Sequence, residues 1–257
     1  MASSSTAASA QAVTPTQERR LRRTNVFLSV LHFAQGIIIL ILGSGFSASV
    51  TTTYIGGGAE YSYEPRILLA TFLFISAFCH MLVSLPGVFP WYIRNLGRRI
   101  NYVRWYEYSF SASVMIVVIA SLCGITELVS LVALFGLTGA MNLFGLMMEL
   151  HNQTTNKTDW TSFVLGSVVG VVPWIGIVLY FASATPGPPT FVYAIVASLI
   201  FLFALFPLNM WLQYARKGWW KSYVFGEYGY MLLSLTAKSL LAWQVFAGTL
   251  NAPQFLQ

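Results

Sequence analysis

Residues 222–250 read SYVFGEYGYMLLSLTAKSLLAWQVFAGTL. The stretch is mostly apolar, and a helix that rises about 1.5 Å per residue over this length crosses a bilayer core of about 30 Å. Lys238 lies well inside the stretch, too far from either end for its side chain to reach water. A charge at the bilayer centre costs about 2.5–3.5 kcal/mol on insertion scales, so this lysine needs a partner or a function.

Six upstream stretches have the same apolar character, and each has the roughly 20 residues that a spanning helix needs. The predicted transmembrane helices cover residues 25–46, 66–88, 102–122, 126–150, 160–183, 190–214 and 222–250. Residues 123–125 separate the third helix from the fourth, and a turn rich in proline, residues 184–189, separates the fifth from the sixth.

The composition of the whole chain supports this interpretation. Of its 257 residues, 56% are hydrophobic and only 9% are charged. Soluble domains have about 25% charged residues, which cover the surface that faces water. This composition excludes a soluble globular enzyme, a disordered chain and a coiled coil. We therefore predict an all-α membrane protein with seven transmembrane helices.

The net charge of +6 predicts an orientation in the cell membrane. In a soluble protein such a charge would indicate nucleic acid, but in a membrane protein Lys and Arg collect on the cytoplasmic side. Eleven of the 14 basic residues fall on the side of the N-terminus, and only Arg66 falls on the opposite side. We therefore expect a cytoplasmic N-terminus, an extracellular C-terminus, the lipid bilayer as a partner and no nucleic acid. The eleven residues are Arg19, Arg20, Arg22, Arg23, Arg94, Arg98, Arg99, Lys157, Arg216, Lys217 and Lys221.

The segments outside the helices complete the predicted organisation. Residues 1–24 are expected to form a disordered basic cytoplasmic tail, residues 25–250 the transmembrane domain, and residues 251–257 a short extracellular tail. In the first extracellular loop, residues 50–55 are rich in β-branched side chains, residues 56–58 are glycines, and residues 59–63 alternate in polarity. This pattern predicts a β-hairpin, which would be steadier if it packed on the helix ends or on a second subunit.

Two interpretations of Lys238 remain open from the residues alone. It could be a structural lysine paired with a carboxylate, or a Schiff-base lysine that carries an aldehyde cofactor, because a site of low dielectric favours the neutral, nucleophilic amine. Glu107 is the best-placed buried carboxylate; it could pair with Arg104, which lies at the (i, i+3) spacing, or serve as the counterion of a Schiff base. Three further carboxylates, Glu127, Glu149 and Glu227, are nearer helix ends, where we expect them at the membrane interface.

A polar layer is predicted in the cytoplasmic half of the bundle. Depth along the helices places His32, His80 and Glu107 at similar levels, with Gln35 and Ser76 one turn from the two histidines. A single intramembrane histidine is usually a hydrogen-bonded core residue. A layer of such groups with a carboxylate is more typical of a proton-accepting network.

No metal site or enzymatic site is predicted. Cys79 and Cys123 fall in apolar stretches, where small buried side chains are expected, and the spacing of a metal motif is missing. The sequence also shows no nucleophile–base constellation, so we do not expect an enzyme. The GxxxG pattern Gly166–Gly170 is explained by close packing of helices.

Short motifs on two helices resemble those of microbial rhodopsins. Ser234-Leu-Thr-Ala-Lys238 is similar to the Asp-x-Ser-Ala-Lys run around the retinal lysine of bacteriorhodopsin-like proteins. Arg104-Trp-Tyr-Glu107-Tyr108 is similar to the Arg-Tyr-x-Asp-Trp run on their third helix.

A third run and three departures narrow the resemblance. Phe203-Ala-Leu-Phe-Pro-Leu-Asn-Met210 has the spacing of the Trp-x-x-Tyr-Pro-x-x-Trp pattern on the sixth helix. However, Ser234 stands where pumps carry a second counterion, Val118 stands where proton pumps carry a donor carboxylate, and the predicted orientation is inverted. This combination resembles the heliorhodopsins over residues 25–250.

The resemblance implies a light-sensing photoreceptor with a slow photocycle, in which Lys238 carries all-trans retinal as a protonated Schiff base and Glu107 is the counterion. It also implies a homodimer, and signalling through an unknown cytoplasmic partner rather than pumping. A light-driven proton or ion translocator is the alternative, and a seven-helix protein without retinal is a third interpretation. Besides Lys238, Glu107 and Ser234, the residues expected to bind the cofactor are Trp105, Tyr108, Ser111, Met115, Asn142, Phe203, Phe206, Pro207 and Met210.

Overall fold

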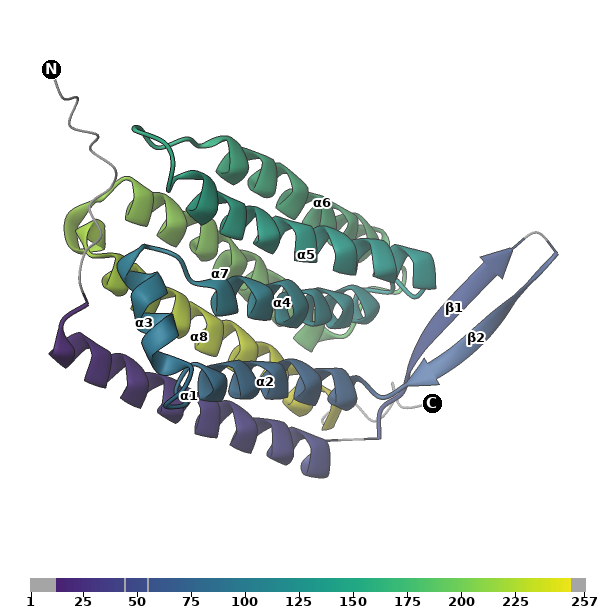
Figure 1. Cartoon of the computed structure of the whole chain (residues 1–257). Coiled ribbons are helices and arrows are strands. Elements are labelled where there is room, and N and C mark those ends of the chain that lie inside the picture. Colours follow the sequence, from purple (N-terminus) through teal and green to yellow (C-terminus); the bar gives the residue numbers. More distant parts are fainter. Residues whose placement is uncertain (1–12, 44, 55, 251–257) are drawn as a thin grey trace, which may run out of the picture.

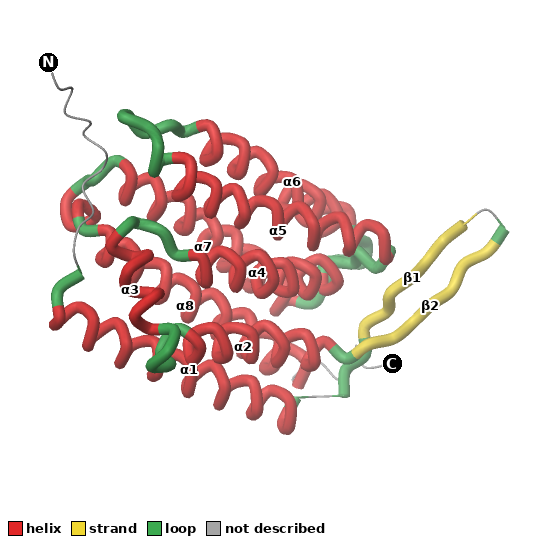
Figure 2. The backbone as a smooth tube through the Cα atoms, viewed as in Figure 1, coloured by secondary structure: helices red, strands yellow, loops and turns green. Residues whose placement is uncertain are grey.

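A bundle of long helices forms the molecule (Figures 1 and 2). The computed structural model describes residues 13–43, 45–54 and 56–250. Within these residues, seven helices are long and apolar enough to cross a membrane, which confirms the predicted fold class and helix number. They are α1 (Pro15–Leu42), α2 (Pro65–Leu82), α4 (Tyr102–Leu122), α5 (Leu128–His151), α6 (Thr161–Ser183), α7 (Thr190–Tyr214) and α8 (Tyr223–Leu250).

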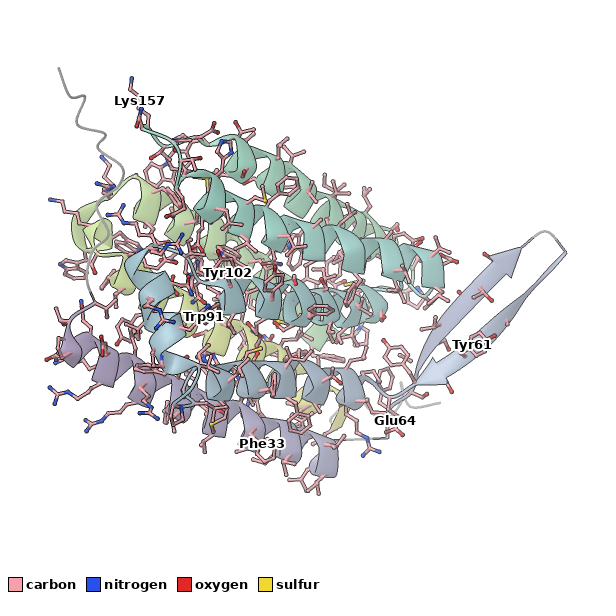
Figure 3. All side chains as sticks on the ribbon, viewed as in Figure 1. Phe33, Tyr61, Glu64, Trp91, Tyr102 and Lys157 are labelled. Carbon is pink, nitrogen blue, oxygen red and sulfur yellow. The ribbon has the colours of Figure 1, made fainter. Side chains whose placement is uncertain are left out.

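The helices pack in sequence order for most of the bundle. α1 packs on α2, α2 on α4, α4 on α5 and α5 on α6, and α7 packs on α8. Leu73, Ile119 and Leu241 are fully buried in the core between α2, α4 and α8. The outer faces are apolar as well. Phe33 on α1, for example, is 56% exposed and points away from the bundle (Figure 3), as expected for a surface that faces lipid.

The first helix begins ten residues earlier than predicted. Thr14 caps α1, because its hydroxyl accepts a hydrogen bond from Gln17 N and the Gln17 side chain accepts one from Thr14 N. This capping box, with Pro15 in the first helical position, is a strong start signal. The arginines of the expected tail are therefore helical, and Leu21 among them is fully buried. The prediction of a disordered tail is wrong for residues 15–24; residues 1–12 and 251–257 lie outside the described residues.

A short helix between α2 and α4 was not predicted. α2 ends at Leu82 instead of residue 88, and α3 (Phe89–Gly97) follows after a turn. Tyr92 and Leu96 on one face of α3 are buried against α1 and α8. The helix was missed because its nine residues are too few to span a membrane and lie in the basic connection between two predicted spanning helices. A single 3₁₀ turn, η1 (Gly218–Lys221), precedes α8.

The predicted β-hairpin is confirmed in the first loop. β1 (Ala48–Tyr54) and β2 (Gly57–Tyr63) pair antiparallel, with Val50 opposite Tyr61. The hairpin extends from the bundle end opposite the start of α1 (Figure 1) and is anchored there, because Thr51 N donates to Thr126 O at 2.9 Å. The predicted break between α4 and α5 is also confirmed. Gly124 makes this turn at φ 96°, a conformation that favours glycine.

The opposite end of the bundle, where α1 begins, carries the four arginines of α1, the connection from α3 to α4, the loop from α5 to α6 and the connection from α7 to α8 (Figure 1). Eleven of the 14 basic residues lie there, and we call it the basic end.

Candidate functional site

Lys238 is buried in the middle of the bundle, with 3% of its side chain exposed. Its Nζ donates a hydrogen bond to Ser234 Oγ at 2.6 Å, because residues four apart on α8 lie on one face. The same Nζ lies 3.0 Å from Glu107 Oε1 on α4. The structure thus brings together three of the predicted site residues.

Glu107 has a second partner from a third helix. Ser76 Oγ on α2 donates to Glu107 Oε1 at 2.6 Å. The carboxylate is 6% exposed, so it faces a lysine and a hydroxyl in a region that excludes bulk water. An ion pair of this kind has a large desolvation cost, which close geometry and additional hydrogen bonds offset.

Arg104 does not pair with Glu107, which corrects one interpretation of the sequence. Its guanidinium binds Glu149 on α5 and Glu227 on α8, and it lies over the ring of Tyr230 at 3.9 Å. The (i, i+3) spacing on α4 permits contact with Glu107, but two carboxylates from other helices converge on the guanidinium instead.

Glu149 near the end of α5 and Glu227 near the start of α8 are enclosed by protein. Both are buried, at 0% and 1% exposure. Asn101, in the connection after α3, covers them: its backbone N donates to Glu149 at 2.9 Å and its side-chain amide donates to Glu227 at 2.6 Å. Tyr223 OH donates to Glu149 at 2.8 Å. Because α3 and its connections fold over the basic end, carboxylates near helix ends are buried here.

A cavity of about 380 Å³ extends from Lys238 between α4, α5, α6 and α7. Most of the predicted cofactor-binding residues line it. Ser111 and Glu107 do not line it; Ser111 is fully buried, and Glu107 lies behind Lys238. The predicted residues on the wall are Trp105, Tyr108, Met115, Asn142, Phe203, Phe206, Pro207, Met210, Ser234 and Lys238.

Several wall residues were missed in the sequence. Gly166 and Gly170, which we interpreted as a packing motif, also line the cavity, as does Trp174, whose ring packs edge-on against Phe203 at 5.2 Å. Gly145 also lines the cavity and leaves room for Trp105, because a Cβ there would lie 2.2 Å from the Trp105 ring. Small residues on α5 and α6 give little signal in a sequence, since close helix packing explains them equally well.

Comparison with known proteins now identifies the family. A family model described as Heliorhodopsin matches residues 21–250. The chain belongs to the heliorhodopsin family. Members of this family are light-sensing retinal proteins of membranes rather than classical enzymes, so this heliorhodopsin is a multi-pass membrane protein with a retinal chromophore. No curated protein matches the sequence of this chain.

The residues of this heliorhodopsin fit retinal. The cavity volume lies within the range of about 300–1,000 Å³ that is usual for small-molecule sites. Its walls are mainly apolar, and Trp105, Trp174 and Phe206 offer ring faces and edges to a flat conjugated chain. Lys238 supplies a primary amine on the wall, the group with which an aldehyde condenses.

The predicted polar layer is present in part. The rings of His32 and His80 are stacked at 5.9 Å, and His80 Nδ1 is hydrogen-bonded to Asn25 Oδ1 at 2.7 Å. Ser76 is joined to this layer through its hydrogen bond to Glu107. Gln35 points elsewhere, because its Oε1 accepts a hydrogen bond from Ser239 at 3.0 Å. Depth counting identified the layer, but it could not show which side chains are connected.

A small cavity of about 40 Å³ lies beside this layer and is lined by His80, Glu107, Arg104 and Asn25, among others. This volume is large enough for one ordered water molecule, and its lining offers several polar partners. Cys79 also lines it. Among the described residues, no group of three His, Cys, Asp or Glu side chains is arranged to hold a metal ion.

Proposed function

We propose that this heliorhodopsin is a light sensor with a slow photocycle, in which Lys238 Nζ carries all-trans retinal as a protonated Schiff base. Glu107 is the counterion. The observation that carries the proposal is the 3.0 Å separation of Lys238 Nζ, which lines the 380 Å³ cavity, from Glu107 Oε1. A buried cation beside one carboxylate is stabilised in its charged form.

Retinal supplies light absorption and isomerisation when it is bound. The chain's own residues hold and move the proton. Ser234 Oγ at 2.6 Å orients Lys238 Nζ, and Ser76 holds the counterion from the other side. The 40 Å³ cavity joins Glu107 to His80, so a water there would connect the nitrogen to the stacked histidines. We propose that the His32–His80 pair accepts the proton.

The proposed slow return of the proton to Lys238 is supported by the residue at position 118. Val118 is fully buried eleven residues after Glu107, at a position where a carboxylate could have returned the proton. An apolar side chain there provides no donor, so reprotonation of Lys238 is slow. A long-lived altered state suits signalling to a cytoplasmic partner better than rapid turnover.

We also propose that the N-terminus lies in the cytoplasm, with the protein in the cell membrane. The basic end carries eleven basic residues and the opposite end one, Arg66. A homodimer is part of the proposal. β2 is largely exposed along its length, and Tyr61 on it is 61% exposed (Figure 3), which leaves hairpin surface for a second copy.

Addition of all-trans retinal to the apoprotein tests the proposal. We expect a visible absorption band in the wild type, no band in Lys238→Ala, and an unchanged band in the control Lys217→Ala, whose exposed side chain lies outside the cavity. Glu107→Gln should shift the band to the red, because the ground-state cation loses its counterion, whereas Glu127→Gln should not. A band that survives Lys238→Ala, or an unshifted Glu107→Gln, contradicts the proposal.

The translocator alternative has a separate test. Illuminated cells that express the protein should show no pH change that an uncoupler removes. A sustained change of this kind would contradict the sensor function while leaving the retinal site intact.

A further inference from the structure

A second large cavity lies at the basic end, apart from the retinal cavity. Its volume is about 390 Å³, its lining is mainly polar, and it shares no lining residue with the first. Three separate connections build it: α3 to α4, α5 to α6 and α7 to α8. Figure 3 shows Lys157 at the tip of the second of these. The cations on its wall are Arg98, Arg99, Lys157, Arg216 and Lys221.

The positive charge of this basic cavity is uncompensated within the described part of the chain. No carboxylate side chain lines it, and none of its five cations forms an ion pair there. Two acids in neighbouring segments have other partners: Glu149 accepts from Tyr223 and binds Arg104, and Asp159 Oδ1 accepts a hydrogen bond from Thr161 N at 2.8 Å. Burial and the neighbouring Arg216 lower the pKa of the Arg99 guanidinium, so the two cations repel each other. A bound anion would relieve this repulsion.

The backbone holds two of the cations at strained positions. Arg99 has φ 61° and Arg216 has φ 50°, and in the described residues they are the two non-glycine residues with positive φ. Each occupies the left-handed position after a helix, because Ile100 N donates to Asn95 O and Lys217 N donates to Leu212 O. Glycine is the usual residue there.

Stabilisation of the helix C-terminus does not explain this choice. A cation anywhere in the last turn interacts favourably with the helix dipole, and Arg98 and Lys217 already stand beside these two positions. Arginine at the left-handed position itself is less favourable than glycine, because its Cβ lies too close to the following carbonyl oxygen. Both strained residues turn out to line the same cavity.

We propose that the basic cavity binds a phosphate group. Arginine guanidinium groups form paired, charge-assisted hydrogen bonds with phosphate oxygens, and a phosphomonoester carries close to two negative charges. Thr158 and Asn156 line the same wall, and the Thr158 hydroxyl and the Asn156 amide can donate to further oxygens. The volume suits a small phosphorylated molecule.

Two sources of the phosphate share this chemistry. A soluble phosphomonoester can enter from the solution that faces the basic end. A lipid headgroup can enter from the membrane surface, where Trp219 is 77% exposed next to the wall residue Trp220, as is typical of an interfacial belt.

The test uses retinal-loaded full-length protein in phosphatidylcholine nanodiscs. One arm titrates glycerol 3-phosphate and measures heat by calorimetry, with glycerol as the control. The other arm includes phosphatidic acid in the nanodisc and measures the lipid that stays bound by native mass spectrometry. The variants are Arg99→Gly and Arg216→Gly, and the matched control is Arg94→Gln, which removes an exposed charge on α3 outside the cavity.

We expect saturable binding in at least one arm for the wild type and Arg94→Gln, and binding about 10- to 100-fold weaker in the two glycine variants. These variants should melt no lower than the wild type, because glycine suits the left-handed backbone, so unfolding cannot imitate the loss. Binding in the first arm identifies a soluble ligand, and binding in the second arm alone identifies a headgroup. Absence of saturable binding in both arms, or an equal loss in Arg94→Gln, overturns the proposal.

Discussion

Replacement of Arg104 by methionine should destabilise the protein strongly. The substitution keeps most of the apolar stem but removes the guanidinium between Glu149 and Glu227. Two charge-assisted contacts are lost, each of about 1.5–3 kcal/mol. The carboxylates keep the donors of Asn101 and Tyr223, so the total should be about 3–5 kcal/mol, as is usual when one partner of a buried ion pair is removed.

The corresponding melting temperature is measured by far-UV circular dichroism in detergent. At about 2–4 °C per kcal/mol for a domain of this size, we expect Arg104→Met to melt about 6–20 °C below the wild type. Arg66→Met is the matched control. Arg66 pairs with Glu64 at the bundle surface, where both side chains are about one third exposed and such a pair contributes about 0–1 kcal/mol.

A third variant isolates the cause of the destabilisation. Arg104→Met combined with Glu149→Gln and Glu227→Gln leaves neutral groups in place of unpaired charges, so it should melt above Arg104→Met alone. If Arg104→Met melts no lower than Arg66→Met, the argument that buried charges require this arginine is refuted.

Three further predictions concern the cavity, the start of α1 and a thiol. Gly145→Ala places a methyl group 2.2 Å from the Trp105 ring and should weaken retinal uptake about 5- to 100-fold, whereas Gly136→Ala on the same helix, with open space around it, should not; equal uptake by the two variants would contradict the cavity assignment. Thr14→Ala removes the cap of α1 and should cost about 1 kcal/mol, measured as a lower melting temperature; no change would mean that the capping box does not hold the helix start. Burial raises the pKa of the Cys123 thiol to about 12, so at pH 8 a Cys79→Ser variant should react with maleimide about 1,000-fold more slowly when folded than when unfolded; equal rates would show an accessible thiolate.

The spanning helices were predictable because bilayer thickness imposes a length and a composition that a sequence shows directly. The helix at residues 102–122 was predicted at its observed bounds; in the structure Asn101 caps its start, and Gly124 lies in the turn that follows it. Short elements at the basic end could not be predicted from the sequence. α3 spans nine residues, and the start of α1 lies outside the apolar run, so only the cap at Thr14 marks it.

The site also contains residues that the sequence identified and contacts that it did not. Lys238 and Glu107 were identifiable because an ionisable group far from the helix ends is unusual in any sequence. The partners of Arg104 were not identifiable, because Glu149 and Glu227 lie 45 and 123 residues away along the chain. Helical spacing predicts Glu107 as the neighbour of Arg104 instead. Helix spacing describes contacts within one helix, whereas the convergence of α4, α5 and α8 depends on packing.

The number of basic residues at the basic end and the exact positions of two of them need separate explanations. The positive-inside tendency depends on the number of Lys and Arg residues near the ends of the helices, and any position in the connections satisfies it. It therefore accounts for the sign and number of charges at this end. It does not account for Arg99 and Arg216 at left-handed positions, where glycine beside the existing Arg98 and Lys217 would keep most of the bias without the backbone strain. The proposed cytoplasmic orientation would account for the basic character of this end, and the proposed phosphate would account for the left-handed positions of Arg99 and Arg216.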